Sequence, residues 1–330
     1  MAIIEEIEVK VIKSELRETF KTALREVVSL AIVRVTINGN FSGDAVETRA
    51  ITGDTLQKIQ SDLQSVAASS LLGREFGNTE SGFQSLIEPL NICRSAKAAL
   101  DMAFTDLCGE LNEGGAVRTD VTVPITPLSE LENVVHSRII AGFTSFKIKL
   151  HDEPLALLIE KMKVIDSVTP TGAQLRVDPN QSWSSEGSIE FLSEMERSGI
   201  AIEYLEQPTT ARDFDALAKV KEGTNTKIMA DESCFTEADL LDLIHRGAID
   251  IVNLKILKNA GVTPVLQMAA LAKENGISVS IGSMMESELG VTYAARLARK
   301  IAPEYVHDLD AAWWLKESSL VYHDGFVSEK

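Results

Sequence analysis

Residues 228–255 read IMADESCFTEADLLDLIHRGAIDIVNLK and contain a strand, a helix and a second strand in succession. The segment begins with the apolar run Ile228–Ala230 and closes with a second run, Ile251–Leu254, each short enough for a buried strand. Between them Thr236 has the character of a helix N-cap, leucines follow at helical spacing, and Gly247 ends the helix. The segment therefore predicts two parallel strands joined by a helix.

This pattern of a β-branched run, a charged cluster and an amphipathic helix recurs eight times from about residue 117. Between Lys147 and Lys255 the ends of successive runs are 31, 28, 25 and 24 residues apart, which is the spacing of βα units. Eight near-equal units close most economically into a TIM-type α/β barrel, with an open doubly wound sheet as the alternative. The runs predicted to be strands are Val121–Pro124, Phe146–Lys149, Leu175–Asp178, Ile202–Glu206, Ile228–Asp231, Ile251–Lys255, Ser278–Ile281 and Tyr305–Asp308.

The N-terminal third of the chain breaks this rhythm and predicts a separate α+β domain, residues 1–116, in front of a barrel domain, residues 117–312. Two runs are expected to form antiparallel strands, and Asn38-Gly39-Asn40 has the composition of a turn. The strands are expected at Val9–Ile12 and Val28–Ile37, and helices at residues 55–72 and 93–110.

The net charge of the chain limits its partners. With 32 Lys and Arg against 49 Asp and Glu, the formal net charge is −17 and the sequence pI is about 4.8. Such an acidic chain repels phosphate and anionic lipid, so we expect neither nucleic acid nor a membrane as a partner. The three cysteines lack disulfide or metal-site spacing, and no secretory signal or membrane span is evident, so we expect a cytoplasmic protein.

Acidic residues end three consecutive predicted strands: Asp178, Glu206 and Asp231. The C-terminal strand ends form the active face of such a barrel, and adjacent strands lie about 4.8 Å apart, so the three carboxylates converge. Without a cation they would repel one another and raise each other's pKa. An all-oxygen set suits Mg²⁺, or Mn²⁺, rather than zinc. For any one of these acids, capping of the next helix or pairing with a neighbour is the alternative.

Lysines end the second and sixth predicted strands. In Lys147-Ile148-Lys149 the strand period of two turns both ammonium groups to the barrel side, and Lys255 lies roughly across the barrel. Two bases would then flank a substrate held by the metal, whereas either lysine alone could simply neutralise the acids. This arrangement suits removal of a proton α to a carboxylate, because a divalent cation takes up the charge on the enediolate oxygens. Return of the proton from the opposite face gives an epimer or a racemate.

The order of these residues on successive strands resembles the muconate-lactonizing subgroup of the enolase superfamily, which implies a (β/α)7β barrel with an α+β capping domain. Within the subgroup, His307-Asp308-Leu309-Asp310 resembles the Asp-x-Asp motif of dipeptide epimerases, in which Asp308 and Asp310 would bind the substrate α-ammonium. The resemblance also implies that residues 313–330 complete the capping domain. Further matches are Leu205–Pro208, Met229–Ser233, Asn253–Lys255 and Gly282–Met284, the last of which makes Ser283 a candidate for substrate binding.

Two segments of the capping domain resemble L-Ala-D/L-Glu epimerases. In Phe20–Arg25 the resemblance implies that Arg25 holds the glutamyl side-chain carboxylate, for which a guanidinium fork is suited. In Ile51–Asp54 it makes Thr52 a candidate for substrate binding. The stretch Gly43–Arg49 departs from the family because it is shorter and has no proline, and the tail after the eighth strand is also brief. Both departures bear on the dipeptide preference.

The resemblance implies Mg²⁺-dependent epimerisation of the C-terminal residue of a dipeptide, L-Ala-D/L-Glu from murein peptide recycling, by 1,1-proton transfer through an enediolate. Lys149 and Lys255 would be the two acid/base residues, and Lys147 would polarise the substrate carboxylate. Three alternatives remain open: an epimerase with hydrophobic or other dipeptide preference, a cycloisomerase or o-succinylbenzoate-forming dehydratase, and a catalytically silent dipeptide-binding protein. The last needs neither acid/base lysine, and the second has substrates without an ammonium. We also expect a homo-oligomer.

Overall fold

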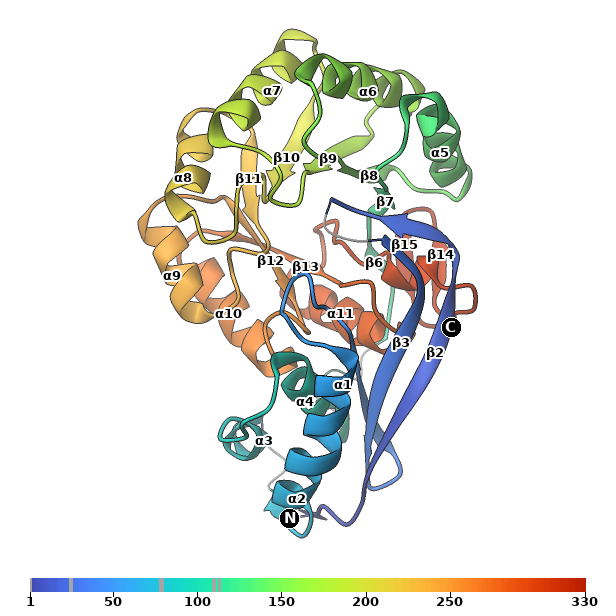
Figure 1. Cartoon of the computed structure of the whole chain (residues 1–330), viewed down its shortest axis with the longest axis vertical. Coiled ribbons are helices and arrows are strands. Elements are labelled where there is room, and N and C mark those ends of the chain that lie inside the picture. Colours follow the sequence, from blue (N-terminus) through green and yellow to red (C-terminus); the bar gives the residue numbers. More distant parts are fainter. Residues whose placement is uncertain (1, 24–25, 77–79, 109–110, 112–113) are drawn as a thin grey trace.

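The computed structural model describes residues 2–23, 26–76, 80–108, 111 and 114–330. The larger part of the chain contains a parallel sheet. Its seven strands are neighbours in the order in which they occur along the chain, as an α/β barrel requires. Figure 1 shows the helices of this part around the outside of the strands. The strands are β7 (Val121–Val123), β8 (Ser145–Lys149), β9 (Gln174–Asp178), β10 (Ile202–Glu206), β11 (Lys227–Ala230), β12 (Ile251–Lys255) and β13 (Ser278–Gly282).

A helix follows each of these strands, and the predicted start and stop signals of the helices are confirmed. At α9 the Thr236 side chain accepts from the amide of Asp239 while the Asp239 carboxylate accepts from that of Thr236, which completes a capping box. Gly247 follows the helix with φ 61°. The helices are α5 (Leu128–Ile140), α6 (Leu155–Val168), α7 (Ser185–Arg197), α8 (Phe214–Glu222), α9 (Glu237–His245), α10 (Val262–Glu274) and α11 (Glu288–Ile301).

The eighth predicted strand is reduced to two single bridges. Asp308 bridges Gly282 at the end of β13, and His307 bridges Thr119 just before β7, so these residues close the barrel. The His307 ring takes over a bond of the sheet, because its Nδ1 accepts from the amide of Ile281 at 3.0 Å. The predicted strand is therefore right in its place but wrong in its length, since a side chain supplies part of the pairing.

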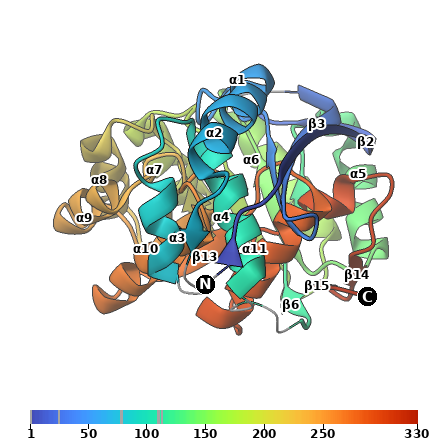
Figure 2. The same cartoon turned by 90° about the horizontal axis from the view of Figure 1, so that it is seen from below.

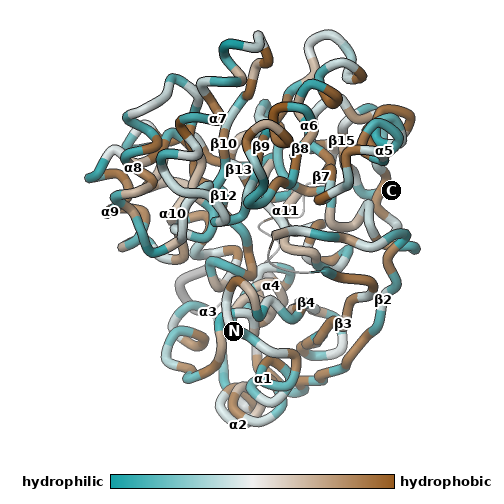
Figure 3. Tube along the Cα trace, turned by 45° about the horizontal axis from the view of Figure 1, so that its top comes forward, coloured by the Kyte–Doolittle hydropathy of each residue, from teal (hydrophilic) through white to brown (hydrophobic). Residues whose placement is uncertain are grey.

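The N-terminal part, which we call the cap, is built on the antiparallel sheet β2-β3-β4. In Figure 1 the β2–β3 ribbon runs from the helices of the cap to the strands of the barrel, and in Figure 3 hydrophobic and hydrophilic segments alternate along it. The predicted turn at Asn38–Asn40 joins β3 to β4. The strands of the cap are β1 (Ala2–Ile3), β2 (Ile7–Lys21), β3 (Glu26–Ile37), β4 (Phe41–Val46) and β5 (Glu75–Phe76).

The helix predicted over residues 55–72 is a succession of α1 (Leu56–Ser61), the π-helical η1 (Asp62–Ala67) and α2 (Ala68–Leu71). The second predicted helix is α4 (Arg94–Cys108), and α3 (Glu80–Ile87) precedes it. Figure 2 shows α4 on the side of the cap that faces the barrel, where it contacts α10. Gly43 allows β4 to lie against α4, because a Cβ there would come within 1.9 Å of the Ala99 carbonyl oxygen.

The C-terminal tail contacts both parts of the chain. The 3₁₀ helix η2 (Ala311–Trp314) leads to Leu315, which bridges Leu16 of β2. Further on, β14 (Val321–His323) and β15 (Phe326–Ser328) form an antiparallel sheet with β6 (Val117–Arg118). The division of the chain at residues 116 and 117, with the tail assigned to the cap, stays a prediction.

Candidate active site

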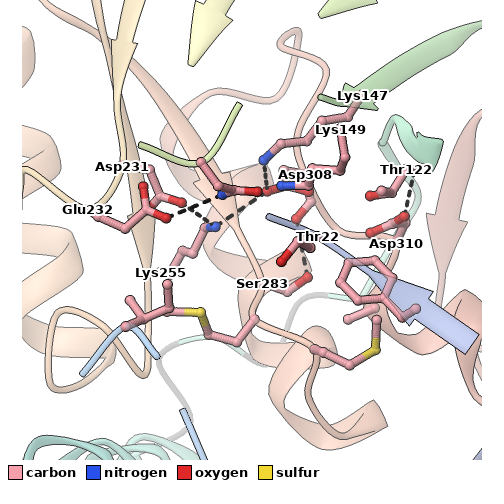
Figure 4. A pocket seen from close by; sticks show the side chains of 16 residues that line it. Thr22, Thr122, Lys147, Lys149, Asp231, Glu232, Lys255, Ser283, Asp308 and Asp310 are labelled. Atoms are coloured by element: carbon pink, nitrogen blue, oxygen red, sulfur yellow. Dashed lines mark hydrogen bonds and ion pairs between the residues drawn. The ribbon is translucent and has the colours of Figure 1, made fainter. Parts of the chain in front are cut away.

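The charged strand ends meet around one cavity at the C-terminal side of the barrel strands (Figure 4). We call it the lysine pocket; its volume is about 50 Å³, and the cap contributes Phe20, Thr22 and Ile51 to its wall. Asp178 and Glu206 are fully buried and ion-paired with lysines of this wall. The predicted site residues that line the pocket are Lys147, Lys149, Asp231, Lys255, Ser283, Asp308 and Asp310.

Lys147 occupies the centre of the acidic group. Its Nζ donates to Glu206 Oε1 at 2.9 Å and to Asp308 Oδ2 at 2.8 Å, and it lies 3.3 Å from Asp178 Oδ2. Burial alone would lower the pKa of Lys147, but the carboxylates of Asp308, Glu206 and Asp178 outweigh burial and raise this pKa well above its usual range. An ammonium in contact with three carboxylates suits a hydrogen-bond donor to a substrate carboxylate.

The two predicted acid/base lysines lie on opposite flanks of the acids. Lys149 ends β8, and its Nζ is 2.5 Å from Asp178 Oδ2 at the end of β9. Lys255 ends β12, and its Nζ is 2.7 Å from Asp231 Oδ2 just after β11. Burial lowers the pKa of Lys255, but the Asp231 carboxylate outweighs burial and the pKa rises. The parallel strands thus present one ammonium from each side, as the strand order predicted.

Several buried oxygens at this site lack a hydrogen-bond partner among the described residues: Asn180 Oδ1, Glu206 Oε2, Glu232 Oε2 and Asn253 Oδ1. Glu206 Oε2 is 2.8 Å from Lys147 Nζ, but outside hydrogen-bond geometry. Burial, and then the charges of Asp178 and Asp231, raise the pKa of Glu206. A further cation would relieve this repulsion and give the oxygens a partner, and an all-oxygen donor set suits Mg²⁺.

The residues therefore fit a magnesium ion in kind, burial and charge. Within the part of the chain that the structure describes, no three acidic, cysteine or histidine side chains are arranged so that they could hold a metal ion. The three carboxylates are instead ion-paired with the ammonium groups of Lys147, Lys149 and Lys255.

Lys258 is a further buried cation at this site that the strand pattern did not indicate. Its Nζ donates to the carbonyl oxygen of Asp231 at 2.6 Å, to Asp231 Oδ1 at 2.8 Å and to the carbonyl oxygen of Asn253 at 2.6 Å. It therefore holds Oδ1 of the Asp231 carboxylate, whereas Lys255 contacts Oδ2. Sequence reasoning missed it because Lys258 lies in the turn after β12, where the strand period of two gives no information.

Glu232 is a second residue that the sequence interpretation did not single out. It lines the lysine pocket next to Asp231, and its Oε1 accepts from Asn180 Nδ2 at 3.3 Å. Burial raises the pKa of Glu232 to about 8, and the neighbouring Asp231 and Asp178 carboxylates add to the rise. The sequence does contain a signal for Glu232, because this residue directly follows Asp231, a predicted metal ligand.

The two aspartates of the Asp-x-Asp motif have different surroundings. Burial raises the pKa of Asp308, but the charges of Lys147, Lys255 and Lys149 outweigh burial and lower it, so this carboxylate belongs to the lysine cluster. Asp310 stands apart from the lysines on the same pocket wall. Its Oδ2 accepts from the amide of Thr122 at 2.7 Å and from Trp314 Nε1 at 2.8 Å.

The other predicted substrate-binding residues are distributed unevenly. Ser283 lines the lysine pocket, with its amide 2.8 Å and its hydroxyl 3.2 Å from the Asp308 carbonyl oxygen. Thr52 lines a neighbouring cavity, and its hydroxyl is hydrogen-bonded to that of Thr48 at 2.5 Å; Ile51 of the same loop reaches the lysine pocket instead. Arg25 lies outside the residues that the structure describes.

Comparison with known proteins identifies the family of the chain. Residues 130–329 match the family model described as Enolase C-terminal domain-like. The chain is 33% identical to the L-Ala-D/L-Glu epimerase of Bacillus subtilis over 324 residues, which cover 94% of this chain and 88% of that protein. None of the described helices is both long and apolar enough to cross a membrane.

The solved structures that resemble this chain include dipeptide epimerases. A substrate-liganded complex of the L-Ala-D/L-Glu epimerase from Bacillus subtilis superimposes with a TM-score of 0.92 at 30% identity, covering 100% of this chain and 97% of that one. A dipeptide epimerase from Enterococcus faecalis, complexed with Mg and L-Leu-L-Tyr, has a TM-score of 0.87 at 28% identity and covers 100% and 98%. The chain belongs to the enolase superfamily, in its family of dipeptide epimerases.

Proposed function

We propose that this chain catalyses the Mg²⁺-dependent epimerisation of the C-terminal residue of L-Ala-D/L-Glu dipeptides, as in the recycling of murein peptides. The observation that carries the proposal is the pair of lysines on opposite flanks of one acidic cluster. Lys149 is next to Asp178 and Lys255 next to Asp231, each at ion-pair distance. A mere dipeptide-binding protein would need neither lysine at these positions.

Asp178, Glu206 and Asp231 are the residues that would hold the magnesium ion. They come from the ends of β9 and β10 and from the residue after β11, and they are buried. Glu206 Oε2 has no hydrogen-bond partner among the described residues. When bound, Mg²⁺ supplies positive charge that offsets the charge developing on the carboxylate oxygens of the substrate as it becomes an enediolate.

In this scheme Lys149 and Lys255 handle the substrate α-proton. The Nζ lone pair of one lysine takes the proton from one face of the α-carbon, and the ammonium of the other returns a proton to the opposite face. Lys147, held charged by Asp308 and Glu206, donates a hydrogen bond to the substrate carboxylate. The two lysines exchange roles when the opposite stereoisomer is the substrate.

The remaining predicted residues recognise the rest of the dipeptide. Asp308 and Asp310 would bind the α-ammonium and Arg25 the glutamyl carboxylate, with Ser283 and Thr52 as further substrate-binding residues. The cap lies over the pocket through Phe20 and Ile51 and thereby excludes water. The oligomeric state stays a prediction.

A second candidate is an epimerase of hydrophobic dipeptides. Its support is the apolar part of the pocket wall, which Phe20, Ile51, Met284 and Met285 form. The Enterococcus faecalis enzyme solved with L-Leu-L-Tyr is similar to this chain over its full length.

The test is to incubate the protein with Mg²⁺ and a panel of acidic, hydrophobic and cationic dipeptides in D₂O, and to follow loss of the C-terminal α-proton by NMR. We expect the fastest exchange with L-Ala-L-Glu and L-Ala-D-Glu. Exchange of no dipeptide would refute the epimerase, and exchange confined to hydrophobic dipeptides would favour the second candidate. Arg25→Gln should slow only the acidic dipeptides, whereas the exposed Arg49→Gln serves as the matched control in the cap.

A further inference from the structure

Trp314 is the residue through which the tail, the barrel and the cap meet at the lysine pocket. It is fully buried at the end of η2. A buried indole N–H needs an acceptor, and Trp314 Nε1 donates to Asp310 Oδ2 at 2.8 Å. The amide of Thr122 donates to the same oxygen at 2.7 Å. The two donors thus hold the Asp310 carboxylate through Oδ2.

The same indole is packed against the cap. The ring of Phe20, which lines the pocket together with Asp310, meets the Trp314 ring edge to face with centroids 4.9 Å apart. Edge-to-face pairs of this kind are specific in geometry and contribute beyond their buried area. A shift of the Trp314 ring would therefore move both the Asp310 carboxylate and the Phe20 ring.

Arg138 of α5 holds the indole from the barrel side. Its guanidinium lies over Trp314 at 4.9 Å and over Trp313 at 4.7 Å from the ring centroids. It also donates to Glu18 of β2, so a single side chain joins the barrel helix to the cap strand. Trp313 shares this stacking contact, and its backbone amide donates to the Asp310 carbonyl oxygen at 2.9 Å. Its side chain makes no described contact with the Asp310 carboxylate, so Trp313→Phe, which keeps the backbone contact, is a natural control.

We propose that Trp314 is a positioning residue for the substrate α-ammonium, which it serves by fixing the Asp310 carboxylate beneath Phe20 of the cap. This inference rests on the proposed function of the site. It predicts that the chain prefers a dipeptide over an isosteric acyl amino acid, and that this preference depends on the Trp314 indole N–H. The two ligands to compare are L-Ala-L-Glu and N-propanoyl-L-glutamate, which differ only in the α-ammonium.

The experiment measures dissociation constants of both ligands by isothermal titration calorimetry in the presence of Mg²⁺. The wild-type chain should bind L-Ala-L-Glu more tightly. Trp314→Phe keeps an aromatic ring but loses the donor, so the ratio of the two constants should fall about tenfold, the size expected for a hydrogen bond to a charged group. Trp313→Phe should leave the ratio unchanged. An equal weakening of both ligands would show a merely structural role and overturn the proposal.

A wild-type measurement covers the case in which Trp314→Phe does not fold. The sequence contains three tryptophans, so ¹⁵N-labelled indoles give three signals, with Trp183 as the internal reference because it donates to the His151 carbonyl oxygen instead. We expect L-Ala-L-Glu, but not N-propanoyl-L-glutamate, to shift the Trp314 signal. Equal shifts, no preference between the ligands, or binding of neither would contradict the inference.

The D₂O exchange assay separates this result from the proposed function. If dipeptides exchange but Trp314→Phe leaves the ratio of the two dissociation constants unchanged, the role of Trp314 is refuted and the proposed function is not. A tryptophan-dependent preference for L-Ala-L-Glu without any exchange refutes the epimerase and leaves ammonium recognition standing.

Discussion

Two layers of charge inside the barrel come from the same strands and differ in what surrounds them. The mouth layer surrounds the lysine pocket and consists of Lys147 in the middle of β8 and the residues at or next to strand ends, Lys149, Asp178, Glu206, Asp231 and Lys255. The inner layer is Arg176 with Asp120 and Glu203. Arg176 lies two residues before Asp178 on β9, so both side chains point to the same side of the strand.

The inner layer has one cation between two acids and is packed among aromatic rings. Arg176 is fully buried, its Nη1 is 2.7 Å from Asp120 Oδ2, and its Nε is 2.7 Å from Glu203 Oε2. The guanidinium lies 5.0 Å from the centroid of the Tyr204 ring and 5.9 Å from that of Tyr305. The comparison teaches that the surroundings decide the role of a charge, and not its level along the strand. Lys147 is in register with Arg176 and lines the ligand cavity, whereas Arg176 is enclosed by two acids and two tyrosine rings and joins strands.

The largest expected effect is in the mouth layer and concerns the two flanking lysines. Lys149→Met or Lys255→Met should lower the rate of epimerisation about 10³-fold, since a positioned acid or base contributes about 10² to 10⁴. Each variant should retain α-proton exchange from only one stereoisomer, as measured by NMR in D₂O. Exchange from both stereoisomers in both variants would falsify the two-base scheme. The exposed Lys163→Met is the control.

The inner layer should respond in stability instead. Arg176→Met leaves Asp120 and Glu203 without their cation, and breaking a buried pair in this way costs about 3 to 5 kcal/mol. We expect this loss in the free energy of unfolding by urea titration, with an unchanged kcat for the folded protein. The double variant Arg176→Met with Asp120→Asn should recover part of the loss. A stable Arg176→Met variant with a much reduced kcat would show that the two layers act together.

His307 lies where the barrel closes and predicts a pH dependence of stability. Burial lowers the pKa of His307 to about 4, and its neutral ring accepts from the Ile281 amide. Below its unfolded pKa of about 6.5 the unfolded chain takes up a proton that the folded chain refuses, so stability falls as the pH falls from about 6.5 to 4.

The expected contribution of His307 is about 3 kcal/mol over that interval. Urea titrations at several pH values measure it. His307→Gln removes the titrating group and should flatten this part of the profile, even if its overall stability is lower. A profile of unchanged slope in the variant would assign the acid sensitivity to other groups.

The smallest expected effect is the stabilisation of the folded chain by Mg²⁺, which should depend on the mouth layer and not on the inner layer. At roughly 100 times its Kd, Mg²⁺ should stabilise the wild-type chain by about 2.7 kcal/mol, and EDTA should reverse the gain. Glu206→Gln should lose most of this stabilisation, whereas Asp120→Asn in the inner layer should keep it. Thermal unfolding with and without Mg²⁺ measures both. Equal stabilisation of all three proteins would place the metal away from Glu206.

The sequence by itself determined the barrel and the residues at its mouth. Strands are regular, so a run that ends in Asp178 or Lys255 places that side chain at the rim wherever the strand lies in the sheet. The same regularity predicted the capping box of α9, since Thr236 and Asp239 are three residues apart. These features depend on neighbours along the chain or on one repeated spacing.

Only the tertiary structure decided which partners these groups have. The Lys258 ammonium on Asp231 and the Lys147 ion pair with Asp308 join residues 27 and 161 positions apart. The contact of Trp314 with Phe20 joins the tail to the cap. Such contacts depend on how separate elements pack, and no local spacing encodes that packing. For the same reason the His307 ring could supply one hydrogen bond of the pairing where the sequence pattern predicted a full strand.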